Sequence, residues 1–127
     1  MKLIIAGGRD YRLTEADHAK LNAIEGVSEV VSGGASGADA GGEVWARARG
    51  LPVKRFPADW NTHGRAAGPI RNQQMAAYAD AVTLFPGGRG TDSMHREAVK
   101  AGLKMFDFRV TASSTAAASR EVLELRS

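Results

Sequence analysis

Three pairs of glycines and one arginine-containing loop are the residues of this sequence whose types and spacing could bind an anion. Gly7-Gly8, Gly33-Gly34 and Gly87-Gly88 each follow a short apolar run. The last pair lies within Pro86-Gly87-Gly88-Arg89-Gly90-Thr91, which offers backbone amides, an arginine and a hydroxyl group side by side. Glycine lets a backbone turn sharply and approach a ligand without a Cβ atom in the way. We therefore expect these loops to hold a phosphate group.

The sequence lacks the motifs of several well-known sites. No Gly-Lys-Ser/Thr follows the third glycine pair and no G-x-G-x-x-G follows the first, which argues against a Walker A loop and a standard dinucleotide site. No serine lies in a G-x-S-x-G elbow. The histidines His18, His63 and His95 lack the paired spacing of a zinc site, and there is no cysteine. We expect neither a metal nor a cofactor.

Polar side chains near the glycine pairs are further candidates to contact a ligand. Arginine suits bidentate contact with phosphate, and Arg71 begins the expected helix that leads to the third pair. Asp39 could hydrogen-bond a ribose hydroxyl or cap its own helix. The candidate ligand-binding residues are Gly7, Gly8, Arg9, Gly33, Gly34, Ser36, Asp39, Arg71, Asn72, Pro86, Gly87, Gly88, Arg89, Gly90 and Thr91.

The elements that must position these residues follow from the apolar pattern, which alternates between short runs and helical spacing. Strands are expected at 2–6, 29–32, 52–56, 81–85 and 104–108. A first helix is expected after Thr14 up to Gly26, with Ala16, Ala19, Ala23 and Ile24 at helical spacing. A second is expected from Asp39 to Gly50, with Val44, Trp45 and Ala48 along it. Two more are expected at 71–79 and from Thr91 or Asp92 to about Gly102. Residues 57–69 have proline at both ends and are expected to form an irregular loop.

Strands that alternate with helices predict right-handed βαβ units. We expect the α/β class: a single Rossmann-like domain over residues 1–110, with a mostly parallel sheet of about five strands and helices on both faces. The carboxyl ends of parallel strands share one edge, where ligands bind. The glycine loops and Arg71 should therefore converge on one pocket. Residues 111–119 are expected to be a linker, and the end of the chain a short helical tail.

Composition sets broader limits. The chain has 127 residues, a net charge of +3 and a pI of about 9.6. This balance suits an anionic partner, nucleic acid included, but no run of Lys or Arg occurs, which favours an ordinary solvated surface. The apolar start is too short for a signal peptide or a membrane span. We expect a cytoplasmic protein without a membrane partner.

The segment from Arg71 to Thr91 resembles the core of the LOG and lysine-decarboxylase-like proteins of the SLOG superfamily, which also includes the DNA-processing protein DprA. Gly7 to Tyr11, Gly33 to Asp39 and Pro57 to Asn72 are similar to the YspA-type branch of that superfamily. The resemblance covers about residues 2–108. It implies a Rossmann-like fold, a nucleotide-derived ligand, a role in nucleotide signalling or phage–host conflict, and a homodimer or higher homo-oligomer.

One departure from the LOG pattern affects the expected activity. LOG enzymes cleave the N-glycosidic bond of nucleoside monophosphates with an arginine, matched here by Arg71, and the glutamate of PGGxGTxxE. That glutamate position falls on Met94, which cannot transfer a proton. Glu97 lies one turn later. We therefore expect binding to be kept and hydrolysis of this type to be lost.

Three hypotheses remain. The first is a sensor, carrier or sequestering protein for a nucleotide-like molecule such as an ADP-ribose derivative. The second is an N-glycosidase whose catalytic residues are Arg71 and Glu97, or a loop carboxylate in place of Glu97. The third is a DprA-like single-strand DNA binder, which the charge fits but which lacks clustered aromatics beside basic residues. Trp60 could stack on a base, although we expect it to pin the 57–69 loop to the core.

Overall fold

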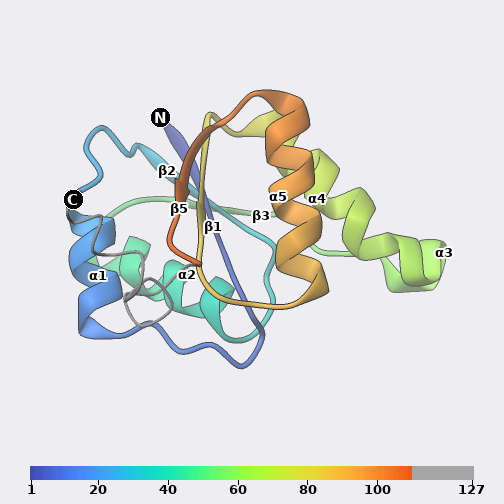
Figure 1. Ribbon diagram of the computed structural model, residues 1–127, viewed down its shortest axis with the longest axis horizontal. Helices are drawn as coiled ribbons and strands as arrows, with labels where there is room; N and C mark the ends of the chain where they lie inside the picture. Colours follow the sequence, from blue (N-terminus) through green and yellow to red (C-terminus); the bar gives the residue numbers. More distant parts are fainter. Residues whose placement is uncertain (110–127) are drawn as a thin grey trace, which may run out of the picture.

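In the computed structural model, which describes residues 1–109, five parallel strands form one sheet in the order β3-β2-β1-β4-β5 (Figure 1). The strands are β1 (Lys2–Ala6), β2 (Glu29–Ser32), β3 (Val53–Arg55), β4 (Ala81–Leu84) and β5 (Lys104–Asp107). The chain builds outward from β1 to β3, then returns to the other side of β1 to form β4 and β5. The order therefore reverses between β1 and β4, and such a switch point opens a crevice at the carboxyl ends of the strands.

Helices connect the strands and cover both faces of the sheet, which confirms the predicted single α/β domain of Rossmann type. They are α1 (Glu15–Asn22), α2 (Ala38–Ala48), α3 (Trp60–His63), the 3-10 turn η1 (Gly64–Ala66), α4 (Ala67–Tyr78) and α5 (Arg89–Ala101). α1 and α2 lie on one side of the sheet and α4 and α5 on the other, while α3 projects outward beside α4 (Figure 1). The predicted linker at 111–119 and the helical tail lie outside the described residues.

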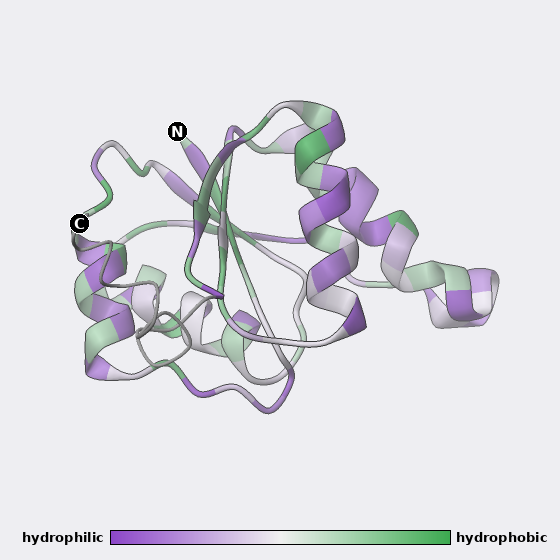
Figure 2. Cartoon of the chain, viewed as in Figure 1, coloured by the Kyte–Doolittle hydropathy of each residue, from purple (hydrophilic) through white to green (hydrophobic). Residues whose placement is uncertain are grey.

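The alternation of side chains along β1 divides the core into two halves. Leu3 and Ile5 pack in a cluster with Trp45 of α2, whereas Ile4 packs on the opposite face in a cluster with Met75 of α4. Hydrophobic residues run along the strands, and hydrophilic and hydrophobic residues alternate along α4 and α5 (Figure 2). None of the helices within residues 1–109 is both long enough and apolar enough to cross a membrane.

The first helix differs from its predicted length and face. It begins after Thr14 as expected, because Thr14 and Asp17 form a capping box, but it ends at Asn22 instead of continuing towards Gly26. Ala16 and Ala19 are exposed, and the helix buries Asp17 and Leu21. The predicted apolar face was therefore wrong. Buried Asp17 is satisfied by the Tyr11 hydroxyl, which donates a hydrogen bond of 2.7 Å to its carboxylate.

Asp39 does not cap α2, so that interpretation was wrong. The helix begins after Gly37, whose conformation (φ 73°, ψ −126°) needs a glycine, and no side chain caps it. Asp39 lies inside the first turn, and its Oδ2 accepts a hydrogen bond of 3.2 Å from the Ala35 amide. Val44, predicted along the helix with Trp45, is 57% exposed.

Residues 57–69 are mostly helical, contrary to the predicted irregular loop. Asp59 caps α3, since its Oδ1 accepts a hydrogen bond of 3.1 Å from the Thr62 amide. Pro69 lies in the first turn of α4, where its missing N–H costs no helical hydrogen bond. Arg71 is consequently the fifth residue of α4 and does not begin it.

The last helix also starts earlier than predicted. α5 begins at Arg89, directly after Gly88, instead of at Thr91 or Asp92. It ends as predicted at Gly102, which adopts the left-handed conformation at φ 72°. The predicted strands β3, β4 and β5 each prove shorter by one or two residues at their ends.

Candidate functional site

The carboxyl ends of β1 and β4 meet at the switch point of the sheet. The Gly8 amide donates a hydrogen bond of 2.9 Å to the Pro86 carbonyl, and the Ala38 amide donates one of 3.1 Å to the Gly8 carbonyl. The loop after β1 is therefore held between the loop after β4 and the start of α2. Two adjoining cavities, of about 570 Å³ and about 480 Å³, open at this edge. Both volumes are typical of small-molecule sites.

The larger cavity brings together the first and third glycine loops and Arg71, which the sequence predicted to converge with the second glycine loop on one pocket. Among the predicted candidates it is lined by Gly7, Gly8, Arg9, Asp39, Arg71, Asn72, Gly88, Arg89, Gly90 and Thr91. The smaller cavity is lined by the second glycine pair and Ser36. Arg9, Ala35, Trp60 and Arg71 line both cavities and so join them. Pro86 and Gly87 line neither.

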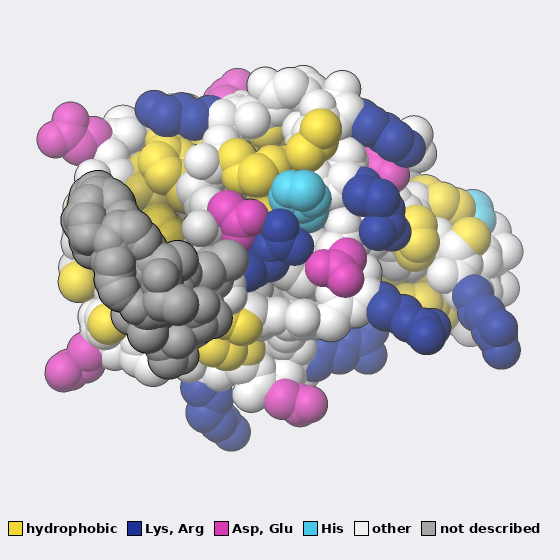
Figure 3. Space-filling view, viewed as in Figure 1, with side chains coloured by type: hydrophobic (Ala, Val, Ile, Leu, Met, Phe, Trp, Pro, Cys, Tyr) yellow, Lys and Arg dark blue, Asp and Glu magenta, His cyan; other side chains and the backbone are white. Residues whose placement is uncertain are grey.

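Six arginines surround the two cavities, although they are far apart in the sequence. They are Arg9, Arg55, Arg65, Arg71, Arg89 and Arg96. No lysine is among the described residues that line the cavities, and Asp39 is the one carboxylate there. Lys and Arg side chains gather on the surface over α4 and α5 and towards α3 (Figure 3). Arg55, Arg65 and Arg96 were not predicted from the sequence, where the basic residues are scattered, because only the fold brings them together.

Arg71 lies where the two cavities meet, and neighbouring loops fix its guanidinium. Its Nη1 donates a hydrogen bond of 2.6 Å to the Gly33 carbonyl, and its Nε donates one of 3.1 Å to Asn72 Oδ1. A Cβ atom at Gly33 would lie 2.5 Å from that same Nη1, so only glycine allows this approach. Burial lowers the pKa of Arg71, while the nearby Asp39 carboxylate opposes the change.

Asp39 is buried beside Arg71, with 8% of its surface exposed. Burial raises its pKa to about 6, although a hydrogen bond from the Ala35 amide and the charge of Arg71 oppose the increase. A carboxyl group with this pKa changes charge near neutral pH, within a cavity lined by arginines. Its ionised form therefore lowers the positive potential of the site, and its protonated form does not.

Asn72 connects α4 to α5 through hydrogen bonds of its side chain. Its side-chain amide donates to the Gly90 carbonyl at 3.3 Å and to Ser93 Oγ at 3.1 Å, while its oxygen accepts from Arg71. With both its donor and acceptor atoms occupied, this buried side chain links α4 to the first turn of α5. It thereby sets the position of Arg71 relative to the loop after β4.

The start of α5 is open towards the larger cavity. Gly88 precedes the helix and no side chain caps it. A Cβ atom at Gly88 or Gly90 would meet no atom within 4 Å, so a ligand can approach this backbone closely. Unpaired amides and the helix dipole favour an anion at such a position. Gly87 allows close packing within the protein instead, because a Cβ atom there would overlap Thr91 Oγ1 and lie 2.6 Å from the Gly8 amide.

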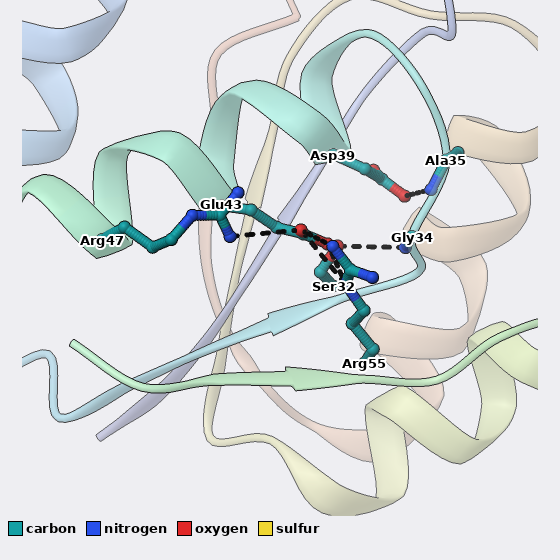
Figure 4. Close-up of polar contacts among 7 residues, drawn as sticks. All are labelled: Ser32, Gly34, Ala35, Asp39, Glu43, Arg47 and Arg55. Atoms are coloured by element: carbon teal, nitrogen blue, oxygen red, sulfur yellow. Dashed lines mark hydrogen bonds and ion pairs between the residues drawn. The ribbon is translucent and has the colours of Figure 1, made fainter.

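An ion pair between the exposed Arg55 and the buried Glu43 holds Arg55 at the edge of the smaller cavity (Figure 4). Arg55 donates from Nη2 to Glu43 Oε1 at 2.5 Å and from Nε to Oε2 at 3.0 Å. Ser32 Oγ donates to Glu43 at 2.6 Å and accepts from the Gly34 amide at 3.0 Å. Burial opposes ionisation of Glu43, but the hydrogen bonds from Arg55 and Ser32 outweigh it and lower its pKa. This network also fixes the loop that contains Gly34.

Met94, at the position of the LOG glutamate, and Glu97, its possible replacement, lie in different surroundings. Met94 lines the larger cavity and is also part of the core, with 1% of its surface exposed. Glu97 lines neither cavity, and its Oε2 pairs with Lys100 Nζ at 3.7 Å. The structure therefore does not bring Glu97 to Arg71. Within residues 1–109, no group of three His, Asp or Glu side chains is placed to hold a metal ion.

Trp60 was expected to pin its segment to the core, but the structure places it otherwise. It is 50% exposed and lines both cavities. The Arg9 guanidinium lies 6.0 Å from the centre of its ring.

Comparisons with known proteins relate the chain to one family. The family described as "YspA, cpYpsA-related SLOG family" matches residues 1–63, which extend from β1 to α3. A relative, "Gene 61 protein" of Mycobacterium phage D29, is 44% identical over 87 residues, which are 62% of this chain and 70% of the relative. No solved structure matches the chain significantly.

Proposed function

The chain belongs to the YspA, cpYpsA-related SLOG family, and from that premise we propose that it binds a phosphate-bearing nucleotide or nucleotide-derived ligand at the crevice between β1 and β4. The observation that carries this proposal is the set of six arginines around two adjoining cavities. Asp39 is the one carboxylate that lines the cavities and Glu43 pairs with Arg55, so the arginines still outnumber the carboxylates and the site favours anions.

The groups on the cavity walls match a phosphate in geometry as well as in charge. Arginine presents a planar group of donors that matches a phosphate in a bidentate contact, whereas lysine acts as a point charge. The uncapped start of α5, beginning at Arg89, adds backbone amides to the same cavity. We place the phosphate between this helix start and Arg71, with the rest of the ligand extending towards the smaller cavity.

The role that fits this site is that of a sensor, carrier or sequestering protein for a molecule such as ADP-ribose. Its relative in a phage is consistent with a function in nucleotide signalling or in conflict between phage and host. A polynucleotide is a weaker candidate, because Trp60 is the one aromatic side chain among the described residues that line the cavities. Proteins that bind single strands use several aromatic platforms.

Arg71→Ala and Arg89→Ala should each weaken binding of ADP-ribose or AMP by roughly 1.5 to 3 kcal/mol, the range for hydrogen bonds to charged groups. This corresponds to about 10- to 150-fold in the dissociation constant. Isothermal titration calorimetry measures the change. The Arg89 side chain is exposed at the start of α5, so its removal should leave the fold intact.

Arg12→Ala is the matched control, since Arg12 is exposed and lines neither cavity. It removes the same charge from the protein and should leave affinity within twofold of wild type. Equal losses in all three variants would show that binding depends on net charge alone. Unchanged affinity in Arg71→Ala and Arg89→Ala would reject the proposed site.

We expect the wild-type protein to release no free base from nucleoside monophosphates. Met94 replaces the glutamate of the LOG pattern, and Glu97 is paired with Lys100 outside the cavities. General acid–base assistance is typically worth a factor of about 100 to 10,000, so its loss should leave no measurable turnover. Chromatography of AMP, GMP, CMP and UMP incubated with the protein checks this.

Two variants make the result decisive if base release is seen. Release that Glu97→Gln abolishes would restore the hypothesis of a LOG-like enzyme. Release that Asp39→Asn abolishes, with Glu97→Gln active, would assign the chemistry to the buried carboxyl beside Arg71. In either case the protein would be an enzyme and not solely a binding protein.

A further inference from the structure

We propose that Trp60, together with Arg9, forms the surface on which a planar heteroaromatic ring of the ligand stacks, so that the site selects a base-bearing ligand over a simple sugar phosphate. This inference rests on the proposed function, because it assumes that a phosphate is held near Arg71. It adds a specificity-determining residue that the glycine loops do not provide.

Trp60 is unusually exposed for a large hydrophobic side chain. The exposed large hydrophobic side chains of the described residues are Val44, Trp60 and Val99. The two valines line neither cavity, whereas Trp60 lines both. Because half of its surface is exposed to water, the indole ring lacks part of the hydrophobic stabilisation that full burial would provide. A flat ligand ring placed against it would recover part of that free energy.

The structure also holds the Trp60 ring in place. Trp60 is the first residue of α3, which the Asp59 cap stabilises. A Cβ atom at Gly68 would lie 3.5 Å from Trp60 Cη2, so one edge of the ring lies over the first turn of α4. A ring that is supported in this way loses little conformational freedom when a ligand binds.

Positive charge lies close to the Trp60 ring. Arg9 lies 6.0 Å from the ring centre, and both Arg9 and Arg71 line each of the two cavities. A guanidinium can stack on a base and also pair with phosphate. Trp60 therefore lies where a base would reach if its phosphate were bound near Arg71. A ligand without a base would leave this surface unused.

The chain contains two tryptophans, which makes the inference measurable by fluorescence. Trp45 is buried at 4% exposure, and its Nε1 donates a hydrogen bond of 2.9 Å to Asn22 Oδ1. Trp45→Phe leaves Trp60 as the single reporter in the cavities. The probes are ADP-ribose and the four nucleoside 5′-monophosphates, each compared with ribose 5-phosphate. If Trp45→Phe does not fold, the difference between wild type and Trp60→Leu gives the same signal.

We expect at least one base-bearing probe to quench Trp60 fluorescence and to bind about 5- to 150-fold more tightly than ribose 5-phosphate, as for stacking measured by alanine substitution. Trp60→Leu should reduce the affinity for that probe to the level of ribose 5-phosphate, and Trp60→Phe should restore part of it. A structural role alone would lower both affinities equally.

Two other outcomes separate this inference from the proposed function. If ribose 5-phosphate binds as tightly as every base-bearing probe and Arg71→Ala weakens them all, the phosphate site stands and stacking on Trp60 is rejected. If none of the probes binds, both the stacking surface and the proposed phosphate site are rejected.

Discussion

Gly37→Ala should destabilise the protein by about 3 to 5 kcal/mol, the sum of backbone strain and overpacking. Gly37 has φ +73°, which is unfavourable for a residue with a side chain. A Cβ atom there would also overlap the carbonyl oxygens of Gly8 and Arg9 and lie 2.5 Å from the carbonyl carbon of Arg9. These atoms belong to the backbone of the loop after β1, so they cannot move aside as a flexible side chain would. Urea unfolding at constant m-value measures the change.

Gly34→Ala is the control that separates strain from contact. Gly34 has a similar φ of +76°, but a Cβ atom there would meet nothing within 4 Å. We expect a loss of about 1 to 2 kcal/mol from strain alone. Equal losses in the two variants would show that the close contact between the start of α2 and the loop after β1 contributes nothing to stability. A larger loss in Gly37→Ala would show that this contact fixes the loop.

Asp39→Asn should stabilise the protein by up to about 3 kcal/mol at pH 8, because each unit of pKa shift corresponds to 1.36 kcal/mol. The pKa of Asp39 is raised from 3.8 to about 6, so folding favours its protonated form. The stabilisation that this provides is complete below about pH 3.8 and is lost as the pH rises through about 6. Asparagine keeps the shape of the side chain without the charge, and its stability should not fall over this interval.

The measurement is urea unfolding of both proteins from pH 4 to pH 8. Glu43 has a lowered pKa and produces a slope of opposite sign, but it is present in both proteins, so its contribution cancels in their difference apart from its charge interaction with Asp39. The difference should be small near pH 4 and grow through pH 6. A difference that stays constant with pH would mean that Asp39 does not change its protonation on folding.

The sequence by itself determined the class of the fold and the loops of the site. β1 and β2 lie at their predicted residues, and Thr14 and Gly102 delimit α1 and α5 as expected. These features depend on local properties: apolar runs, a capping box and a glycine in left-handed conformation. The alternation of strands and helices then dictates that the glycine loops share one edge, because right-handed crossovers allow few other arrangements.

Only the tertiary structure decided which charged and aromatic side chains surround the cavities. Arg55 lies in β3, Arg65 in η1 and Arg96 in α5, and nothing in their separation along the chain relates them. Trp60 was expected to pin its segment to the core, and Asp39 was interpreted either as a ligand contact or as a helix cap; the structure places both side chains at the larger cavity, where Asp39 does not cap α2. Local sequence can indicate where a helix starts and where a strand ends. The meeting of side chains from different elements depends on packing over the whole sheet, and this is why the positions of Arg55, Arg65 and Arg96, the burial of Asp39 and the exposure of Trp60 became visible only in three dimensions.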